Sequence, residues 1–171
     1  PLHHPLPLAK QLATAAIMSG DRFVLGVGAS WAPEEYEYCG IEWATRAARM
    51  RETVEALRLL LSGEWVSYEG VTINFGPVVC RPAPRVVPPI LFGGHLDASL
   101  RRAAALGDGW IAGPIGSFDE LEALIARLRQ LVAEGNSNKQ VATRLGIAIK
   151  TVESHRAAAM RKAGVRTAGQ F

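Results

Sequence analysis

The chain has 171 residues, 49% of them hydrophobic and 20% charged, so it is long enough to bury a core as one domain or two small ones. It shows no run of eighteen apolar residues and no secretory signal pattern, so we expect no membrane partner and a cytoplasmic location. The net charge of +3 is uneven: residues 1–132 hold twelve Lys and Arg against fourteen Asp and Glu, and residues 133–171 hold seven against two. A basic terminal segment suits nucleic-acid phosphates, although a solvated helix is often basic too.

The first ninety residues alternate between helical and extended patterns. We predict, in chain order, a helix, a short buried strand, a loop, a long amphipathic helix and a β-hairpin: residues 8–18, 22–28, 29–42, 44–61, and 65–68 with 71–75. One face of the long helix is apolar and comprises Met50, Val54, Leu57 and Leu61. The hairpin turn is expected at Glu69-Gly70, and a proline-rich loop follows the second strand.

Strands and helices alternate again after this loop. The predicted elements are a strand, a helix, a strand and a helix: residues 89–93, 97–106, 109–112, and from 119 onward. This alternation is typical of a parallel sheet covered by helices. The fold class expected for the first part of the chain is therefore α/β.

Beyond residue 131 the pattern is entirely helical. Helices are predicted over 138–145 and 149–163, with a further short one from Thr167, and the first two have the spacing of a helix-turn-helix. The amphipathic segment 119–132 runs into Gly135 without a flexible linker, so one helix is shared by both parts of the chain. We expect domains at 1–131 and 132–171.

The two cysteines, Cys39 and Cys80, lack the paired spacing of a zinc site or a redox motif. Two cysteines without an export signal also argue against a disulfide framework. We expect ordinary packing roles for both and predict no metal site.

Two pairs of glycines stand at the ends of predicted strands. Gly26-Val27-Gly28 lets the backbone approach a planar ring closely, although a Gly-x-Gly is more often only a tight turn. Gly93-Gly94 precedes the helix from Asp97, where backbone N–H groups and the positive helix end suit a cofactor phosphate. The alternative for this second pair is an ordinary helix cap.

Several stretches of the first part strongly resemble the luciferase-like flavin and deazaflavin oxidoreductase family: residues 5–14, 19–31, 46–52, 76–77, 90–95 and 100–110. The resemblance implies part of a (β/α)8 TIM barrel with its site at the carboxyl ends of the strands, and FMN or coenzyme F-420 as cofactor. It also implies that Gly26, Val27, Gly28, Gly93 and Gly94 bind that cofactor.

Catalytic residues are not identified by this resemblance. The sugar-phosphate dehydrogenase branch places a glutamate directly after the Gly-x-Gly, where this chain has Ala29, so that branch is disfavoured. For His3, His4 and His95 a solvated or capping role is favoured over catalysis. Only three of eight barrel strands are predicted, so the sheet has open edges and an isolated monomer is not expected to turn over.

The C-terminal part resembles the LuxR-type helix-turn-helix DNA-binding domain over residues 134–147, 150–156 and 160–165. The resemblance implies contact with phosphates or base edges through residues of the recognition helix and nearby basic residues. These are Lys139, Lys150, Thr151, Ser154, His155, Arg156, Arg161 and Lys162. The alternative is a surface helical hairpin with scattered basic residues.

Three functional hypotheses follow. The chain is a luciferase-like, FMN- or F-420-dependent oxidoreductase fragment fused to a LuxR-type module. Alternatively, it is a transcriptional regulator that binds DNA and contains a non-catalytic barrel fragment. The third hypothesis is a fusion without function. LuxR-type modules commonly act as dimers, so a homodimer is a possible assembly.

Overall fold

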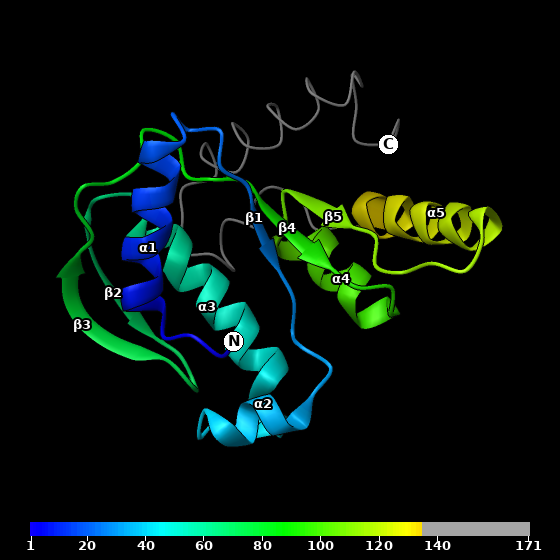
Figure 1. The fold of residues 1–171 in the computed structure, drawn as a ribbon, viewed down its shortest axis with the longest axis horizontal. Coiled ribbons are helices and arrows are strands. Elements are labelled where there is room, and N and C mark those ends of the chain that lie inside the picture. The colour runs from blue at the N-terminus through cyan, green and yellow to red at the C-terminus, as the bar shows by residue number, and fades with distance from the viewer. Residues whose placement is uncertain (135–171) are drawn as a thin grey trace. The chain divides into compact units, whose positions relative to one another are not determined.

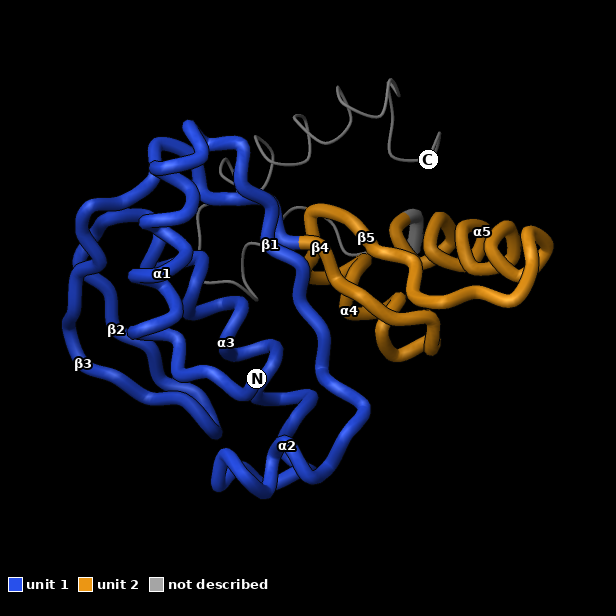
Figure 2. Tube along the Cα trace, viewed as in Figure 1, with its two compact units in different colours: residues 1–90 blue, residues 91–171 orange. Residues whose placement is uncertain are grey.

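The computed structural model describes residues 1–134 of the chain. Its elements are α1 (Pro5–Met18), β1 (Leu25–Val27), α2 (Pro33–Tyr38), the 3-10 helix η1 (Trp43–Thr45), α3 (Arg46–Leu60), β2 (Trp65–Glu69), β3 (Asn74–Val79), β4 (Ile90–Gly93), α4 (Asp97–Leu106), β5 (Gly109–Ile111) and α5 (Phe118–Glu134) (Figure 1). They belong to two compact units, residues 1–90 and the residues from 91 on (Figure 2). The helices predicted over 138–145, over 149–163 and from 167 lie outside the described residues.

Helix α1 begins at Pro5, three residues before the predicted start. His4 has an extended backbone and its Nδ1 accepts a hydrogen bond from the Leu6 amide at 3.3 Å, so it serves as the N-cap. Proline fits the first helical position because its fixed φ suits a helix and no N–H donor is wasted there. The capping role favoured for His4 is confirmed.

The core of the first unit lies where α1 packs on α3. Its fully buried members are Ala9, Leu12, Ala13, Leu57, Leu60, Leu61 and Cys80. The apolar face predicted for the long helix is confirmed, because Met50, Val54, Leu57 and Leu61 are each at most 2% exposed. The packing role expected of Cys80 is confirmed as well, whereas Cys39 is exposed and that prediction was wrong.

The predicted buried strand over 22–28 and the loop over 29–42 both differ from the structure. Strand β1 covers only Leu25–Val27 and is at most half-buried, and it follows a turn with positive φ angles at Gly20 and Asp21. The loop contains the short helix α2, which Pro33 opens and whose first turn holds Glu34 and Glu35. Carboxylates stabilise a helix N-terminus, which accounts for this turn of helix.

Strands β2 and β3 form the predicted antiparallel hairpin, but its turn lies at Gly70–Ile73 and the second strand begins three residues late. Glu52 of α3 causes the shift. Its carboxylate accepts hydrogen bonds from the amides of Val71, Thr72 and Ile73 at 2.8–3.1 Å and from the Thr72 hydroxyl at 2.6 Å. These amides are therefore bound by Glu52, and strand pairing resumes at Asn74 opposite Glu69.

In the second unit β4 and β5 pair in parallel, with Phe92 opposite Trp110, which agrees with the predicted parallel arrangement. Helix α4 has the predicted bounds, and its buried residues Leu100 and Ala103 lie one turn apart. Helix α5 runs to Glu134 and packs on α4. Within residues 1–134 no helix is both long enough and apolar enough to cross a bilayer.

The Glu52 cluster yields a test of stability. An ionised carboxylate that is 1% exposed is tolerated only when its charge is fully hydrogen-bonded. We expect Glu52→Gln to lower the free energy of unfolding by about 2 kcal/mol, because the neutral amide accepts weaker hydrogen bonds and brings in an NH2 group without an acceptor. Urea denaturation followed by circular dichroism measures the loss. Glu69→Gln, on the exposed side of the hairpin, is the matched control; equal losses would contradict the assignment.

The hydrogen bonds of Glu52 also predict how the stability difference between wild type and Glu52→Gln depends on pH. Burial alone would raise the pKa of Glu52, but the hydrogen bonds from Thr72, Val71 and Ile73 outweigh it and lower the pKa from its ordinary 4.5. A carboxyl whose folded pKa is lowered stabilises the fold above its unfolded pKa and loses that stabilisation as the pH falls through its folded pKa. The stability difference between wild type and Glu52→Gln should therefore be constant near neutrality and shrink below pH 4.5.

Candidate functional site

The segment Gly26-Val27-Gly28 lies at the carboxyl end of β1. Gly26 and Gly28 are exposed, and Val27 is half-buried. A Cβ added at Gly28 would meet no heavy atom within 4 Å, and the residue does not need a positive φ. Neither packing nor backbone conformation within the described residues thus requires glycine at this position. The backbone faces open space there, which fits the close approach of a flat ring.

The loop that follows Gly28 is held by side chains of α2. Ser30 has a φ of 56° and its hydroxyl donates to Glu35 Oε2 at 2.5 Å while accepting from the Ala32 amide at 3.2 Å. The Tyr36 hydroxyl donates to the Ala29 carbonyl at 2.6 Å, and the Tyr36 ring is fully buried. The loop therefore has a fixed conformation although it lies at the surface.

Gly94, at the end of β4, differs from Gly28 because the fold itself requires it. Its φ is +115°, and a Cβ would lie 2.9 Å from the Ser99 hydroxyl in the first turn of α4. The Trp110 indole N–H donates to the Gly94 carbonyl at 2.7 Å and so ties this loop to β5. Gly93 pairs with Ile111 in the parallel strands.

The N-terminus of α4 follows directly. Its N-cap residue is Leu96, so no side chain accepts a hydrogen bond from the first-turn amides there. Asp97 opens the helix and is held by Arg127 Nε at 2.7 Å and Arg101 Nε at 2.6 Å. Hydrogen bonds from Arg127 and then Arg101 lower the pKa of Asp97. The carboxylate and the two guanidinium groups are thus paired at this helix end, whose free backbone N–H groups favour an anion.

Sequence reasoning missed this cluster. The Asp97–Arg101 pair has the i,i+4 spacing of a helical ion pair and was visible in the sequence. Arg127 lies thirty residues from Asp97 along the chain, and no local signal indicates that contact.

The predicted cofactor-binding residues fall in different units: Gly26, Val27 and Gly28 in the first, Gly93 and Gly94 in the second. His3 and His95 are exposed, and His95 Nδ1 lies 3.6 Å from where a Cβ on Gly113 would be. Within the described residues no three His, Cys, Asp or Glu side chains are grouped to hold a metal ion. The predicted DNA-binding residues, from Lys139 to Lys162, lie outside the described part.

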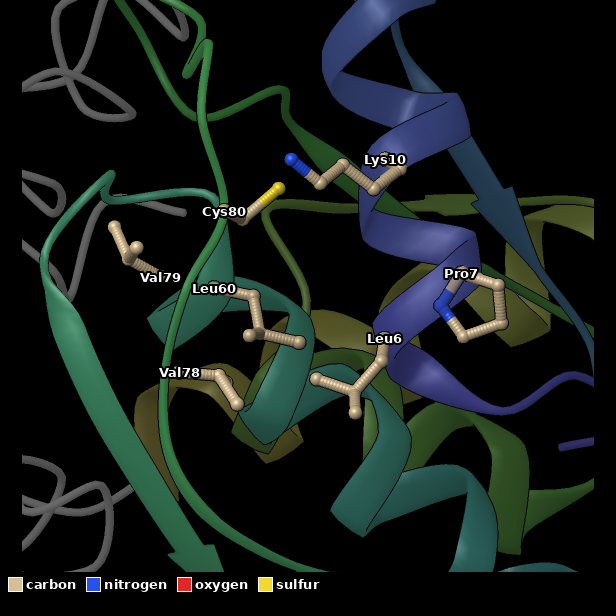
Figure 3. Close-up of a pocket in the computed structure, with 7 residues that line it drawn as sticks. All are labelled: Leu6, Pro7, Lys10, Leu60, Val78, Val79 and Cys80. Atoms are coloured by element: carbon tan, nitrogen blue, oxygen red, sulfur yellow. The ribbon is translucent and has the colours of Figure 1, made fainter.

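A separate pocket of about 320 Å³ lies in the first unit beside the core (Figure 3). It is lined by Leu6, Pro7, Lys10, Leu60, Val78, Val79 and Cys80. The lining is apolar apart from Cys80 and Lys10. The Lys10 ammonium group donates to the Arg81 carbonyl at 2.5 Å. None of the predicted cofactor-binding residues borders it. A ligand site needs several convergent polar groups to fix orientation, so this pocket is not the candidate site.

The described fold is α/β, and glycines lie at the ends of β1 and β4. This fold is similar to that of a solved monooxygenase of Streptomyces bottropensis, with a TM-score of 0.68 and 24% identity, over 95% of this chain and 56% of that one. The family described as luciferase-like monooxygenase matches residues 1–169. The chain belongs to this family. The match includes residues 132–169, which the sequence pattern assigned to a LuxR-type unit.

Two curated relatives show how much of such a protein is present. An uncharacterized protein of Mycobacterium tuberculosis is 42% identical over 134 residues, which are 78% of this chain and 46% of the relative. An F-420-dependent glucose-6-phosphate dehydrogenase of Microbacterium testaceum is 32% identical over 64% of this chain and 33% of its own length. The chain therefore spans less than half the length of these relatives.

The different structural roles of Gly28 and Gly94 can be tested without any ligand. Gly94→Ala should lower the free energy of unfolding by about 1 to 3 kcal/mol, because alanine is strained at this φ and collides with Ser99. Gly28→Ala should leave it unchanged or raise it by at most about 1 kcal/mol through the less flexible unfolded chain. Thermal and urea unfolding of both variants measure the difference. A destabilised Gly28→Ala would show that the fold needs this glycine.

Proposed function

We propose that this chain is the cofactor-binding part of a luciferase-like oxidoreductase that uses coenzyme F-420 for hydride transfer. The observation that supports it most directly is Gly28, a strand-end glycine whose added Cβ would meet no atom of the described residues and which their packing does not require. A glycine that packing among the described residues does not require leaves space that suits a flat ligand. When bound, the cofactor would supply the hydride chemistry, and the chain would supply binding and orientation.

The proposal gives each glycine segment a separate role. Gly26, Val27 and Gly28 would contact the planar ring through the backbone. Gly93 and Gly94 would bring backbone N–H groups at the start of α4 to a phosphate of the cofactor, with Arg101 and Arg127 adding positive charge. Asp97 limits that charge, so the α4 end should bind a phosphate weakly by itself and contribute mainly to orientation.

F-420 is favoured over FMN because the Microbacterium testaceum relative is named as F-420-dependent. Its sugar-phosphate substrate is not carried over, because Ala29 stands where that branch has a glutamate. FMN remains the alternative that the binding experiment distinguishes. No catalytic residue is proposed, since none of His3, His4 and His95 has a described partner that would make it a proton carrier.

The binding test uses the whole chain and substitutions at two glycines, Gly28 and Gly76, at each of which an added Cβ meets nothing within 4 Å. Coenzyme F-420 and FMN are titrated separately, and the anisotropy of the cofactor's own fluorescence is followed. Gly28→Val should weaken cofactor binding at least tenfold, about 1.4 kcal/mol, because the side chain fills the space over the strand end. Gly76→Val in β3, where an added Cβ also meets nothing within 4 Å, is the control and should bind like wild type.

The outcomes separate the cofactors as well as the function. Tighter binding of F-420 than of FMN supports the proposal as stated, and the reverse order replaces F-420 by FMN. Absence of saturable binding of either cofactor by a folded sample would refute it.

DNA binding by the C-terminal segment is a second candidate function. It is supported by the LuxR-type pattern over residues 134–165 and by the excess of basic residues beyond residue 132. The chain would then act as a regulator, with the barrel part as a cofactor-dependent or inert domain and a homodimer as the DNA-bound form. This hypothesis rests on sequence alone, because the residues concerned lie outside the described part.

A salt titration tests this second candidate. Binding to duplex DNA should weaken steeply as salt is raised, because phosphate contacts release counterions. Lys150→Ala should weaken binding at every sequence and reduce the salt slope by about one, and His155→Ala should weaken binding too. Lys10→Ala, which removes a positive charge from α1, is the control. Binding that is insensitive to salt, or equally affected by all three substitutions, would argue against a LuxR-type mode.

A further inference from the structure

Trp31 stands out among the side chains of the first unit because it is 89% exposed. Of the aromatic residues near it in the sequence, Tyr36 is fully buried and meets Trp43 edge-on, with ring centroids 4.9 Å apart, whereas Tyr38 at the end of α2 is 85% exposed. An indole ring normally buries most of its large apolar surface. Leaving the ring in water therefore works against folding, and the packing of the described residues gives no reason for this position.

The backbone around Trp31 is held by hydrogen bonds, although the Trp31 side chain itself is exposed. Ala29 is held by the Tyr36 hydroxyl, and Ser30 and Ala32 are tied together by the Ser30 hydroxyl, which also binds Glu35. Ser30 adopts a φ of 56°, a left-handed conformation that is uncommon for a residue other than glycine. Strained backbone held by surrounding contacts is typical of ligand-binding segments. The loop thus presents Trp31 in a set position at low entropic cost for a binding partner.

Trp31 also belongs to the same strand end as the proposed ring site. It follows Gly28 by three residues, so the two Cα atoms are at most about 11 Å apart. An indole extends several ångströms from its own backbone and can cover a flat ring that lies over Gly28. Trp65, the other strongly exposed tryptophan of this unit, lies in hairpin strand β2 instead.

We propose that Trp31 is a stacking residue that covers one face of the cofactor's conjugated ring at the carboxyl end of β1. The inference rests on the proposed function and deepens it. Aromatic side chains prefer offset stacking on planar rings, and such stacking tolerates either a flavin or a deazaflavin. Trp31 would act as a binding and positioning residue, with no part in bond making or breaking.

The experiment uses the full chain, coenzyme F-420 as the probe, and the variants Trp31→Ala, Trp31→Phe and Trp65→Ala. Anisotropy of the cofactor fluorescence measures affinity, and the ligand-dependent quenching of tryptophan emission measures proximity.

We expect Trp31→Ala to weaken F-420 binding about tenfold and to remove most of the quenching. Trp31→Phe should retain much of the affinity, because a phenyl ring still stacks. Trp65→Ala should match wild type in both measurements. Circular dichroism should show all variants folded, since Trp31 is almost fully exposed.

The outcomes keep this inference separate from the proposed function. If wild type binds F-420 and Trp31→Ala binds it equally well, the stacking role is wrong and the cofactor proposal stands. If Trp31→Ala and Trp65→Ala weaken binding alike, the effect is not specific to the strand end and the stacking role is again wrong. If folded wild type binds no F-420, the proposed function fails and this inference fails with it.

Discussion

The buried carboxylate of Glu52 is the constraint on which the first unit depends. It lies on α3, is 1% exposed, and accepts hydrogen bonds from the amides of three consecutive residues at the hairpin turn. Because a buried charge is costly when any of its hydrogen bonds is lost, α3 cannot slide or rotate relative to the turn. The Glu52 carboxylate also requires glycine at position 70, since a Cβ there would lie 2.7 Å from Glu52 Oε2. The opposite side of α3 packs on α1, so one polar anchor and one apolar interface fix the helices of this unit.

Local signals allowed much of the fold to be predicted, and contacts distant in sequence account for the differences. Helix α4 has the predicted bounds because both of its signals are local. Its apolar residues have helical spacing, and Gly107 follows the last helical residue directly. The hairpin was placed correctly, but its turn was not, because Glu52 lies nineteen residues before the first amide it binds. Helix α2 was missed although Pro33 and Glu34 are local signals, since six residues are too few for a periodic pattern.

The sequence predicts which glycines form the candidate site, but it does not give the structural reason for each glycine. Gly28 and Gly94 look alike in a sequence, each ending a strand. The structure separates them: Gly94 needs its positive φ and has Ser99 beside it, whereas Gly28 has neither constraint. The positive cluster at α4 also depends on Arg127, which reaches Asp97 from another helix. Such distinctions depend on which atoms meet in space, and no pattern within a segment encodes them.

The segment that begins at Gly28 therefore departs from what stability alone would select. A glycine that packing does not require adds entropy to the unfolded chain, Ser30 adopts an uncommon φ, and Trp31 leaves a large apolar ring in water. Sequences that fold well are locally consistent, and departures concentrate where a ligand or partner repays them. Three departures within four residues are more informative than any one of them, because open space, a fixed backbone and an exposed ring are together what a flat ligand needs.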